Sequence, residues 1–89
     1  MKHTKEEIAA WVRQAITDVV GYTHSEITDE KSLDVDLGID LLEKVELALD
    51  AEERFGISIS NKEAKETNTV GALIGIVVRK LEKKGEVAA

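Results

Sequence analysis

A helix-start signature that occurs twice is the feature that most constrains the fold of this chain. At its first occurrence Thr4 precedes Glu7 by three residues, the spacing of a capping box in which each side chain satisfies a free backbone N–H. Gly21 stands where the helix would end, because glycine readily adopts the left-handed conformation that terminates helices. The sequence therefore predicts a helix over about residues 5–20. Its core-facing residues recur at helical spacing: Ile8, Val12, Ala15, Ile16 and Val19.

The second signature, Asp40 followed by Glu43, predicts a helix over about residues 41–55, closed by Gly56. This helix carries two apolar stripes, whereas a surface helix needs only one. Four acids share a further arc of about 80°. The second apolar stripe either packs inside a bundle or stays partly exposed beside the acids, like a binding anchor with a charged rim. The first stripe holds Leu47, Ala51 and Phe55, the second Leu42, Val45 and Leu49, and the acidic stripe Glu43, Glu46, Asp50 and Glu53.

The remaining segments are less regular. Residues 21–39 show no sustained period, and a loop of this length is often functional. Residues 57–60 alternate Ile and Ser, which is typical of a short strand or of a loop that turns its isoleucines inward. Asn61 predicts a helical turn over residues 62–66, and Thr69 predicts the cap of a last helix. The apolar face of that helix holds Val70, Leu73, Ile74, Val77 and Leu81.

Length and charge restrict the class of protein. The 89 residues predict one domain spanning 1–89, with a core at about 5–82 and a frayed tail over 83–89. A net charge of -6 argues against binding to nucleic acid or to anionic membranes, which attract clustered Lys and Arg. No apolar run approaches the ~20 residues of a membrane span, and the N-terminus lacks the apolar core of a signal peptide. We therefore expect a cytoplasmic protein.

Residues 36–47 read Asp-Leu-Gly-Ile-Asp-Leu-Leu-Glu-Lys-Val-Glu-Leu. This segment resembles the motif D-L-G-x-D-S-L-x-x-V-E-L of the acyl carrier protein family. Residues 52–59 continue the likeness with acids and Phe-Gly-Ile, and residues 69–71 are similar to the start of the family's last helix. Because the match covers about residues 5–82 and its central motif is specific, the chain is identified as a member of this family.

The resemblance implies an all-α four-helix bundle with a long first loop and a short third helix. It implies a carrier rather than an enzyme. In the family, a serine at the start of the second helix holds 4′-phosphopantetheine through a phosphodiester. Acyl chains on this arm pass between enzymes of fatty-acid, lipid or polyketide biosynthesis. The attachment motif falls on Gly38, Asp40 and Leu42, where a helix start favours phosphate and glycine lets a transferase approach closely.

The resemblance also implies partners with basic patches, namely phosphopantetheinyl transferase, ketosynthase and acyltransferase. We expect the protein itself to be a monomer. The docking surface predicted for these partners holds Glu43, Val45, Glu46, Leu49, Asp50 and Glu53. The plain alternative is that these acids form only a solvated face.

The chain departs from the family at the attachment position, where Leu41 replaces the serine. Leucine has no hydroxyl, so the sequence as written predicts a form that cannot be loaded. An engineered block, a natural homologue that lost the arm and a sequence error are all compatible with Leu41. The resemblance therefore implies an acyl carrier in an unloadable form, and the alternative is a partner-binding or regulatory homologue that keeps only the docking surface.

Other sites fit the residues poorly. Ser32 lies in Ser-Leu-Asp but lacks the preceding Asp and the helix start, so we do not expect modification there. The acids around Gly38 fail the EF-hand spacing. With no cysteine and only His3 and His24, neither a zinc site nor a nucleophile beside a base is indicated. The sequence therefore predicts no metal site and no catalysis.

Overall fold

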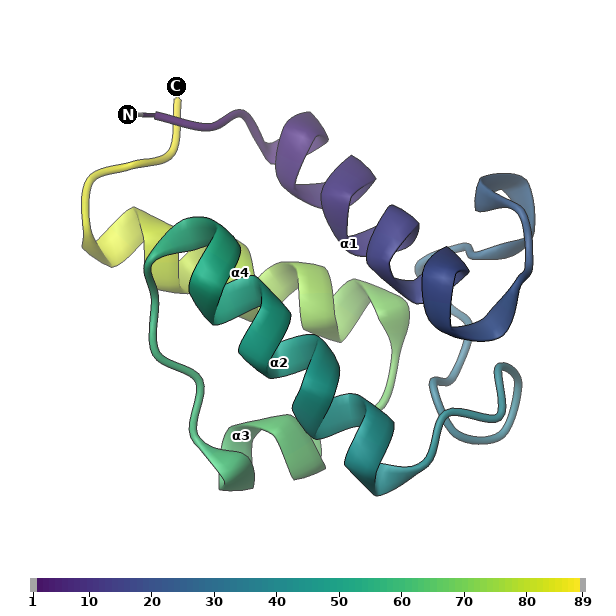
Figure 1. Cartoon of the computed structure of the whole chain (residues 1–89). Coiled ribbons are helices and arrows are strands. Elements are labelled where there is room, and N and C mark those ends of the chain that lie inside the picture. The colour runs from purple at the N-terminus through teal and green to yellow at the C-terminus, as the bar shows by residue number, and fades with distance from the viewer. Residues whose placement is uncertain (1, 89) are drawn as a thin grey trace.

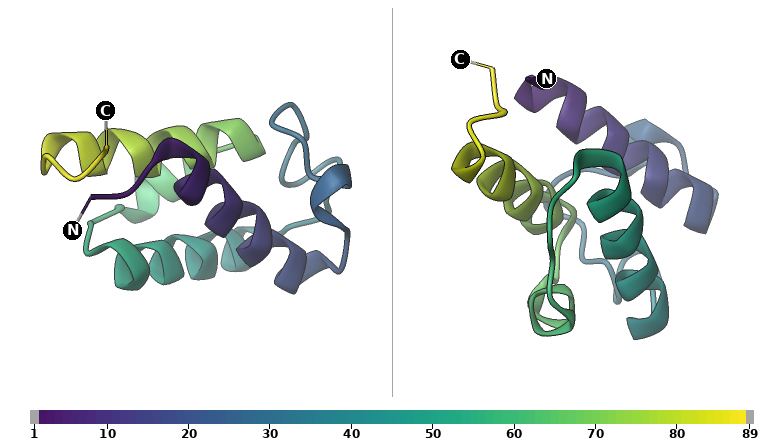
Figure 2. Two further views of the ribbon diagram at one scale, coloured as in Figure 1. Left: turned by 90° about the horizontal axis from the view of Figure 1, so that it is seen from above. Right: turned by 60° about the vertical axis from the view of Figure 1, so that its left-hand side comes forward.

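The computed structural model describes residues 2–88, with the backbone alone for His24, and its regular elements in this range are all helical. Figure 1 shows four α-helices connected by loops, and Figure 2 shows α1 crossing over α2 and α4. None of these helices combines the length and apolar character that a membrane crossing requires. The helices are α1 (Lys5–Val20), α2 (Leu41–Phe55), α3 (Asn61–Glu66) and α4 (Val70–Lys83), with a short 3₁₀ helix η1 (His24–Glu26).

The two predicted capping boxes are present and set the predicted starts of α1 and α2. The Thr4 hydroxyl accepts the Glu7 N–H at 3.1 Å, and the Thr4 N–H donates to the Glu7 carboxylate at 3.2 Å. At the other ends, Gly21 and Gly56 have φ of 79° and 65°. Both predicted helices are therefore confirmed at both ends.

The third helix begins one residue earlier than the sequence predicts. Ser60, rather than Asn61, is the cap, because its hydroxyl accepts the Glu63 N–H while Glu63 accepts the Ser60 N–H. The preceding segment is a loop whose Ile57 and Ile59 are buried, so the inward-turned loop is the correct alternative.

The long first loop is tied to the start of α4. Leu33 donates its N–H to the Asn68 carbonyl at 2.8 Å, and Gly71 donates to the Asp29 carbonyl at 2.9 Å. A Cβ on Gly71 would lie 3.2 Å from Asp29, so glycine allows this close approach. The η1 turn in this loop was not predicted. These contacts position the segment that leads into α2.

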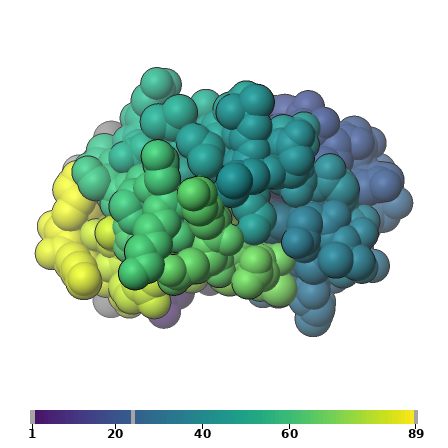
Figure 3. Space-filling model, turned by 90° about the horizontal axis from the view of Figure 1, so that it is seen from below, coloured from purple at the N-terminus to yellow at the C-terminus, as the bar shows by residue number. Residues whose placement is uncertain are grey.

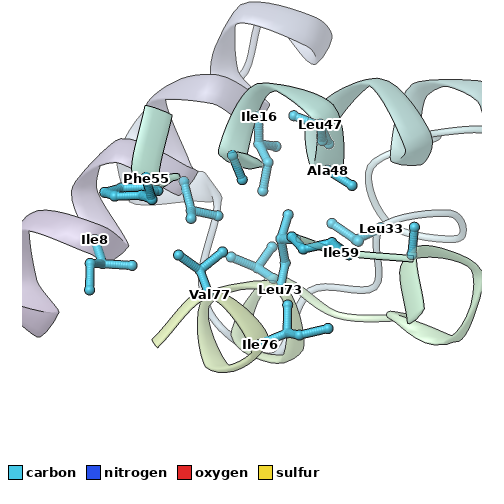
Figure 4. Close-up of a cluster of buried hydrophobic side chains, with 14 of the residues drawn as sticks. Ile8, Ile16, Leu33, Leu47, Ala48, Phe55, Ile59, Leu73, Ile76 and Val77 are labelled. Carbon is cyan, nitrogen blue, oxygen red and sulfur yellow. The ribbon is translucent and has the colours of Figure 1, made fainter. Parts of the chain in front are cut away.

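The core lies between α1, α2 and α4 and is completed by loop residues (Figure 4). Three positions differ from the predicted stripes, and one of them, Ala15, is only partly buried. Val19 is 37% exposed near the end of α1, and Ile74 is only partly buried because the buried face of α4 turns toward Ile76. The largest fully buried side chains are Ile8, Ile16, Ile27, Leu33, Ile39, Leu47, Leu81, Val12, Val70 and Val77.

The described residues of the C-terminal tail make specific contacts with the N-terminal segment. His3 donates its N–H to the Glu86 carbonyl and accepts the Ala88 N–H, both at 2.8 Å. The His3 ring also packs edge-on against Phe55, with 5.1 Å between ring centroids. His3 is therefore partly buried rather than a plain surface residue, whereas the side chain of His24 lies outside the described part of the chain.

Candidate functional site

The helix cap and the glycine of the attachment motif are both in place at the start of α2. Asp40 accepts the Glu43 N–H at 2.8 Å and donates its own N–H to Glu43 at 3.0 Å. Gly38 has φ of 69°, a conformation that favours glycine, and no atom lies within 4 Å of the position that a Cβ would take. The approach to the helix start is therefore open on the Gly38 side.

Leu41 is the first residue of α2 and is 49% exposed. Its side chain is half in solvent and consists of carbon alone. The nearby candidate hydroxyl, that of Ser32, accepts the Asp36 N–H at 2.9 Å, and the Ser32 N–H donates to the Asp36 carboxylate at 2.8 Å. Ser32 thus holds a turn in the long loop and pairs with Thr69 just before α4, rather than starting a helix itself.

The two apolar stripes of α2 have different surroundings. Leu47, Ala51 and Phe55 are buried in the core, with exposed fractions of 5% or less. Leu42 and Leu49 are 66% and 51% exposed. Val45, between them, is partly buried and packs against the core, so the second stripe is the partly exposed one that the sequence left as an alternative.

The acids of α2 fall into two groups. Glu43 belongs to the capping box, and Glu52 accepts the Ile59 N–H at 3.1 Å, which fixes the following loop. Glu46, Asp50 and Glu53 are exposed and have no hydrogen bond or ion pair among the described residues. These three carboxylates are the ones available to an external cation.

Lys44 of α2 is buried, with only 9% of the residue exposed. Its Nζ lies 3.4 Å from the Lys65 carbonyl oxygen and 3.5 Å from the Asn68 side-chain oxygen. Lys44 therefore links α2 to the end of α3 and the loop that follows. Figure 3 shows α2 and α3 adjoining on the face seen from below. No sequence signal indicates this burial, because lysine is normally exposed.

An ion pair connects the other side of α3 to α4. Lys80 Nζ lies 3.0 Å from a Glu63 carboxylate oxygen. The Ser60 backbone N–H and the Lys80 ammonium lower the pKa of Glu63 from 4.5 to about 2. Glu63 is thus an acid with a structural partner, in contrast to the free acids of α2.

Comparisons with known proteins agree with this geometry. A family model described as the phosphopantetheine attachment site matches residues 10–77. The acyl carrier protein of an Exiguobacterium species is 41% identical over 78 residues, which cover 88% of this chain and 99% of that protein. The meromycolate extension acyl carrier protein of Mycolicibacterium smegmatis is 37% identical over 89 residues, or 100% of this chain and 90% of its own length. The solved structure of the acyl carrier protein from Enterococcus faecalis has a TM-score of 0.77 at 29% identity, covering 88% of this chain and 99% of that one.

Proposed function

Because the chain belongs to the acyl carrier protein family, whose members carry 4′-phosphopantetheine and are not enzymes, we propose that it docks onto carrier-dependent enzymes in a form that cannot be loaded. Its partners are biosynthetic enzymes with basic patches: a phosphopantetheinyl transferase, a ketosynthase or an acyltransferase. We place this activity in the cytoplasm. The observation that carries the proposal is the exposed apolar stripe of α2 beside unpaired acids.

The residue at the attachment position does not fit the arm. A phosphodiester needs a side-chain hydroxyl, and Leu41 offers none. The Asp40 cap and the open backbone at Gly38 remain, so the frame of the site is retained while the reacting atom is absent. The retained cap and the missing hydroxyl together support a protein that docks onto partner enzymes but carries no arm.

The docking surface consists of Leu42, Val45, Glu46, Leu49, Asp50 and Glu53. Half-exposed leucines supply contact area that gains from leaving water, and the neighbouring acids supply complementarity to Lys and Arg. Glu43 lies at its edge because its carboxylate is engaged in the cap. Such charges act mainly on the association rate and on its salt dependence.

A second candidate function is supported by the same retained frame. If Leu41 is the native residue, the chain is a partner-binding or regulatory homologue that occupies the enzymes without delivering an acyl chain. The native codon at position 41, together with the neighbouring genes, distinguishes this from a carrier whose serine was replaced. Ketosynthase or acyltransferase genes beside a serine codon favour the carrier.

The docking proposal is tested by measuring binding to a carrier-dependent ketosynthase and to a phosphopantetheinyl transferase at rising salt. The screening length shrinks from ~10 Å at 0.1 M to ~3 Å at 1 M, so affinity should fall. Glu46→Lys should weaken binding further without unfolding the protein, because Glu46 is exposed and unpaired. Leu49→Ala should weaken binding with less change in the salt slope.

The control is Glu66→Lys, which makes the same charge change at an exposed position on α3. It should alter affinity much less than Glu46→Lys does. If Glu46→Lys leaves the affinity for every tested enzyme unchanged, the acidic stripe is only a solvated face and the docking proposal is wrong.

A further inference from the structure

The aliphatic side chains in the first turns of α2 lie on one side of the helix, and Leu41 is the first of them. Leu41, Val45 and Leu49 stand four residues apart, a spacing that makes side chains neighbours on a helix surface. Leu42 stands three residues before Val45 and therefore borders it. The three leucines are about half exposed or more, while Val45 is partly buried against the core. These four residues form an aliphatic strip that a partner would meet as one surface.

Free acids line one side of the aliphatic strip. Glu46 stands four residues after Leu42, and Glu53 stands four residues after Leu49. Both acids are exposed and make no hydrogen bond or ion pair among the described residues. The surface that fits the strip best therefore has an apolar centre, with lysines or arginines along one edge.

The fold itself makes little use of the Leu41 side chain. The cap of α2 is closed by Asp40 and Glu43, through their carboxylates and backbone N–H groups. Leu41 is about half exposed, and it does not belong to the core cluster of the described residues. Aliphatic surface gains free energy when it leaves water, so this side chain is available for contact with a partner.

We propose that Leu41 is an apolar anchor of the docking surface, and that it selects enzymes with an apolar pocket opposite the start of α2. The anchor rests on the docking function proposed for this chain. A family member with serine at this position presents a phosphodiester, whose negative charge attracts lysine and arginine. Leu41 gives such a cation no counter-ion and would cover it from water, which is costly. An apolar pocket gains from the same contact, so Leu41 changes which enzyme surface fits best.

The first test shortens the Leu41 side chain and measures affinity for a carrier-dependent ketosynthase by titration calorimetry at several salt concentrations. Leu41→Ala should weaken binding by about five-fold, because it removes an apolar contact beside the acids. The dependence of affinity on salt should stay the same, since no charge changes. Leu41→Met keeps an apolar side chain of similar size and should hold the affinity within about two-fold of the unchanged chain.

Leu41→Glu gives a sharper test, because the two kinds of partner surface predict changes of opposite sign. An apolar pocket would have to take the new carboxylate out of water, so affinity should fall below that of Leu41→Ala. A basic patch at this place would pair with the carboxylate, so affinity would rise. Tighter binding of Leu41→Glu than of the unchanged chain would therefore overturn the anchor.

Val19 supplies the matched controls, because it is an exposed aliphatic residue on α1 rather than on α2. Val19→Ala and Val19→Glu make the corresponding changes and should keep the affinity within about two-fold of the unchanged chain. Circular dichroism checks that each variant is folded. A loss for Val19→Ala as large as that for Leu41→Ala would show that the effect is not specific to the strip and would overturn the anchor.

The anchor and the docking function fail separately. If added salt and Glu46→Lys weaken binding while Leu41→Ala leaves it unchanged, the docking function stands and the anchor is wrong. If Leu41→Ala weakens binding while neither added salt nor Glu46→Lys does, the anchor is retained and the acidic stripe is only a solvated face.

Discussion

The two apolar stripes of α2 use the same kind of residue in opposite surroundings. Leu47 is 2% exposed among core side chains, whereas Leu49, two positions later, is 51% exposed beside free acids. Burial of the first stripe explains why the helix is fixed in the fold. In the second stripe Val45 still packs against the edge of the core, whereas Leu42 and Leu49 remain more than half exposed. Because its leucines are exposed, the second stripe is available for contacts with other molecules.

The acids show the same contrast. Glu63 has a capping N–H and the Lys80 ammonium as partners, while Glu46 has neither a hydrogen bond nor an ion pair among the described residues. One carboxylate stabilises the position of α3, and the other is free to meet a cation of a partner. Exposure and pairing, rather than residue type, distinguish the acid that stabilises the fold from the acid that is left free.

The largest expected effect concerns the exposed start of α2. Incubation with coenzyme A and a phosphopantetheinyl transferase should add no mass to the unchanged chain. The Leu41→Ser variant should accept one arm, because the hydroxyl is the only part of the attachment motif that is missing. Intact-protein mass spectrometry measures both. Modification of the unchanged chain, for instance at Ser32, would contradict the assignment of Leu41 as the attachment position.

The contrast between the two leucines can be tested directly on stability. Leu47→Ala should lower the free energy of unfolding by roughly 2–5 kcal/mol, because it removes buried methylenes and leaves a cavity. Leu49→Ala should change it by about 0.5 kcal/mol or less. Urea denaturation followed by circular dichroism gives both values. Equal losses for the two variants would mean that Leu49 also packs inside the fold.

The replacement at position 41 should have a small effect on stability. Since Leu41 is half exposed, Leu41→Ser should shift the free energy of unfolding by less than roughly 1 kcal/mol in the same assay. Ile39→Ser, two residues earlier, is the matched control and should cost roughly 2–5 kcal/mol, because Ile39 is buried. A loss of several kcal/mol for Leu41→Ser would place Leu41 in the core.

The smallest effect is the pH dependence of Glu63. Its folded-state pKa is lowered to about 2, so its stabilising contribution is complete above about pH 4.5 and is lost as the pH falls through about 2. Glu63→Gln should therefore destabilise the protein more at pH 6 than at pH 2.5 in urea melts. Glu66→Gln, on the exposed side of α3, should change little at either pH. A Glu63→Gln effect that does not vary with pH would contradict the pairing.

Most of the fold could be predicted because its helix ends are encoded locally. The boxes at Thr4 and Asp40 and the glycines that close α1 and α2 act through neighbouring residues, so the two longest predicted helices have the observed bounds. The start of α3 was misplaced because Ser60 and Asn61 are both good caps, and the reciprocal bond with Glu63 decides between them. Local rules failed where two neighbouring residues satisfied them equally well.

The sequence predicts which residues make up the candidate site, but it does not predict whether each side chain is buried or exposed. Helical spacing alone placed Leu42 and Leu49 on one stripe, yet it could not show that this stripe faces solvent. Burial of Lys44 depends on acceptors more than 20 residues away in sequence, at Lys65 and Asn68. Its role could not be anticipated, because such pairings arise only when α3 and its loop pack against α2.

The contact of His3 with residues 86–88 also determines how the protein can be attached to something else. It brings the two ends of the described chain to the same corner of the molecule, and Figures 1 and 2 show this corner far from the start of α2. A flanking domain, a fused tag or a surface tether at either end would therefore emerge on the side opposite to Leu41. Immobilisation through either end should leave the first turn of α2 fully accessible to a large enzyme.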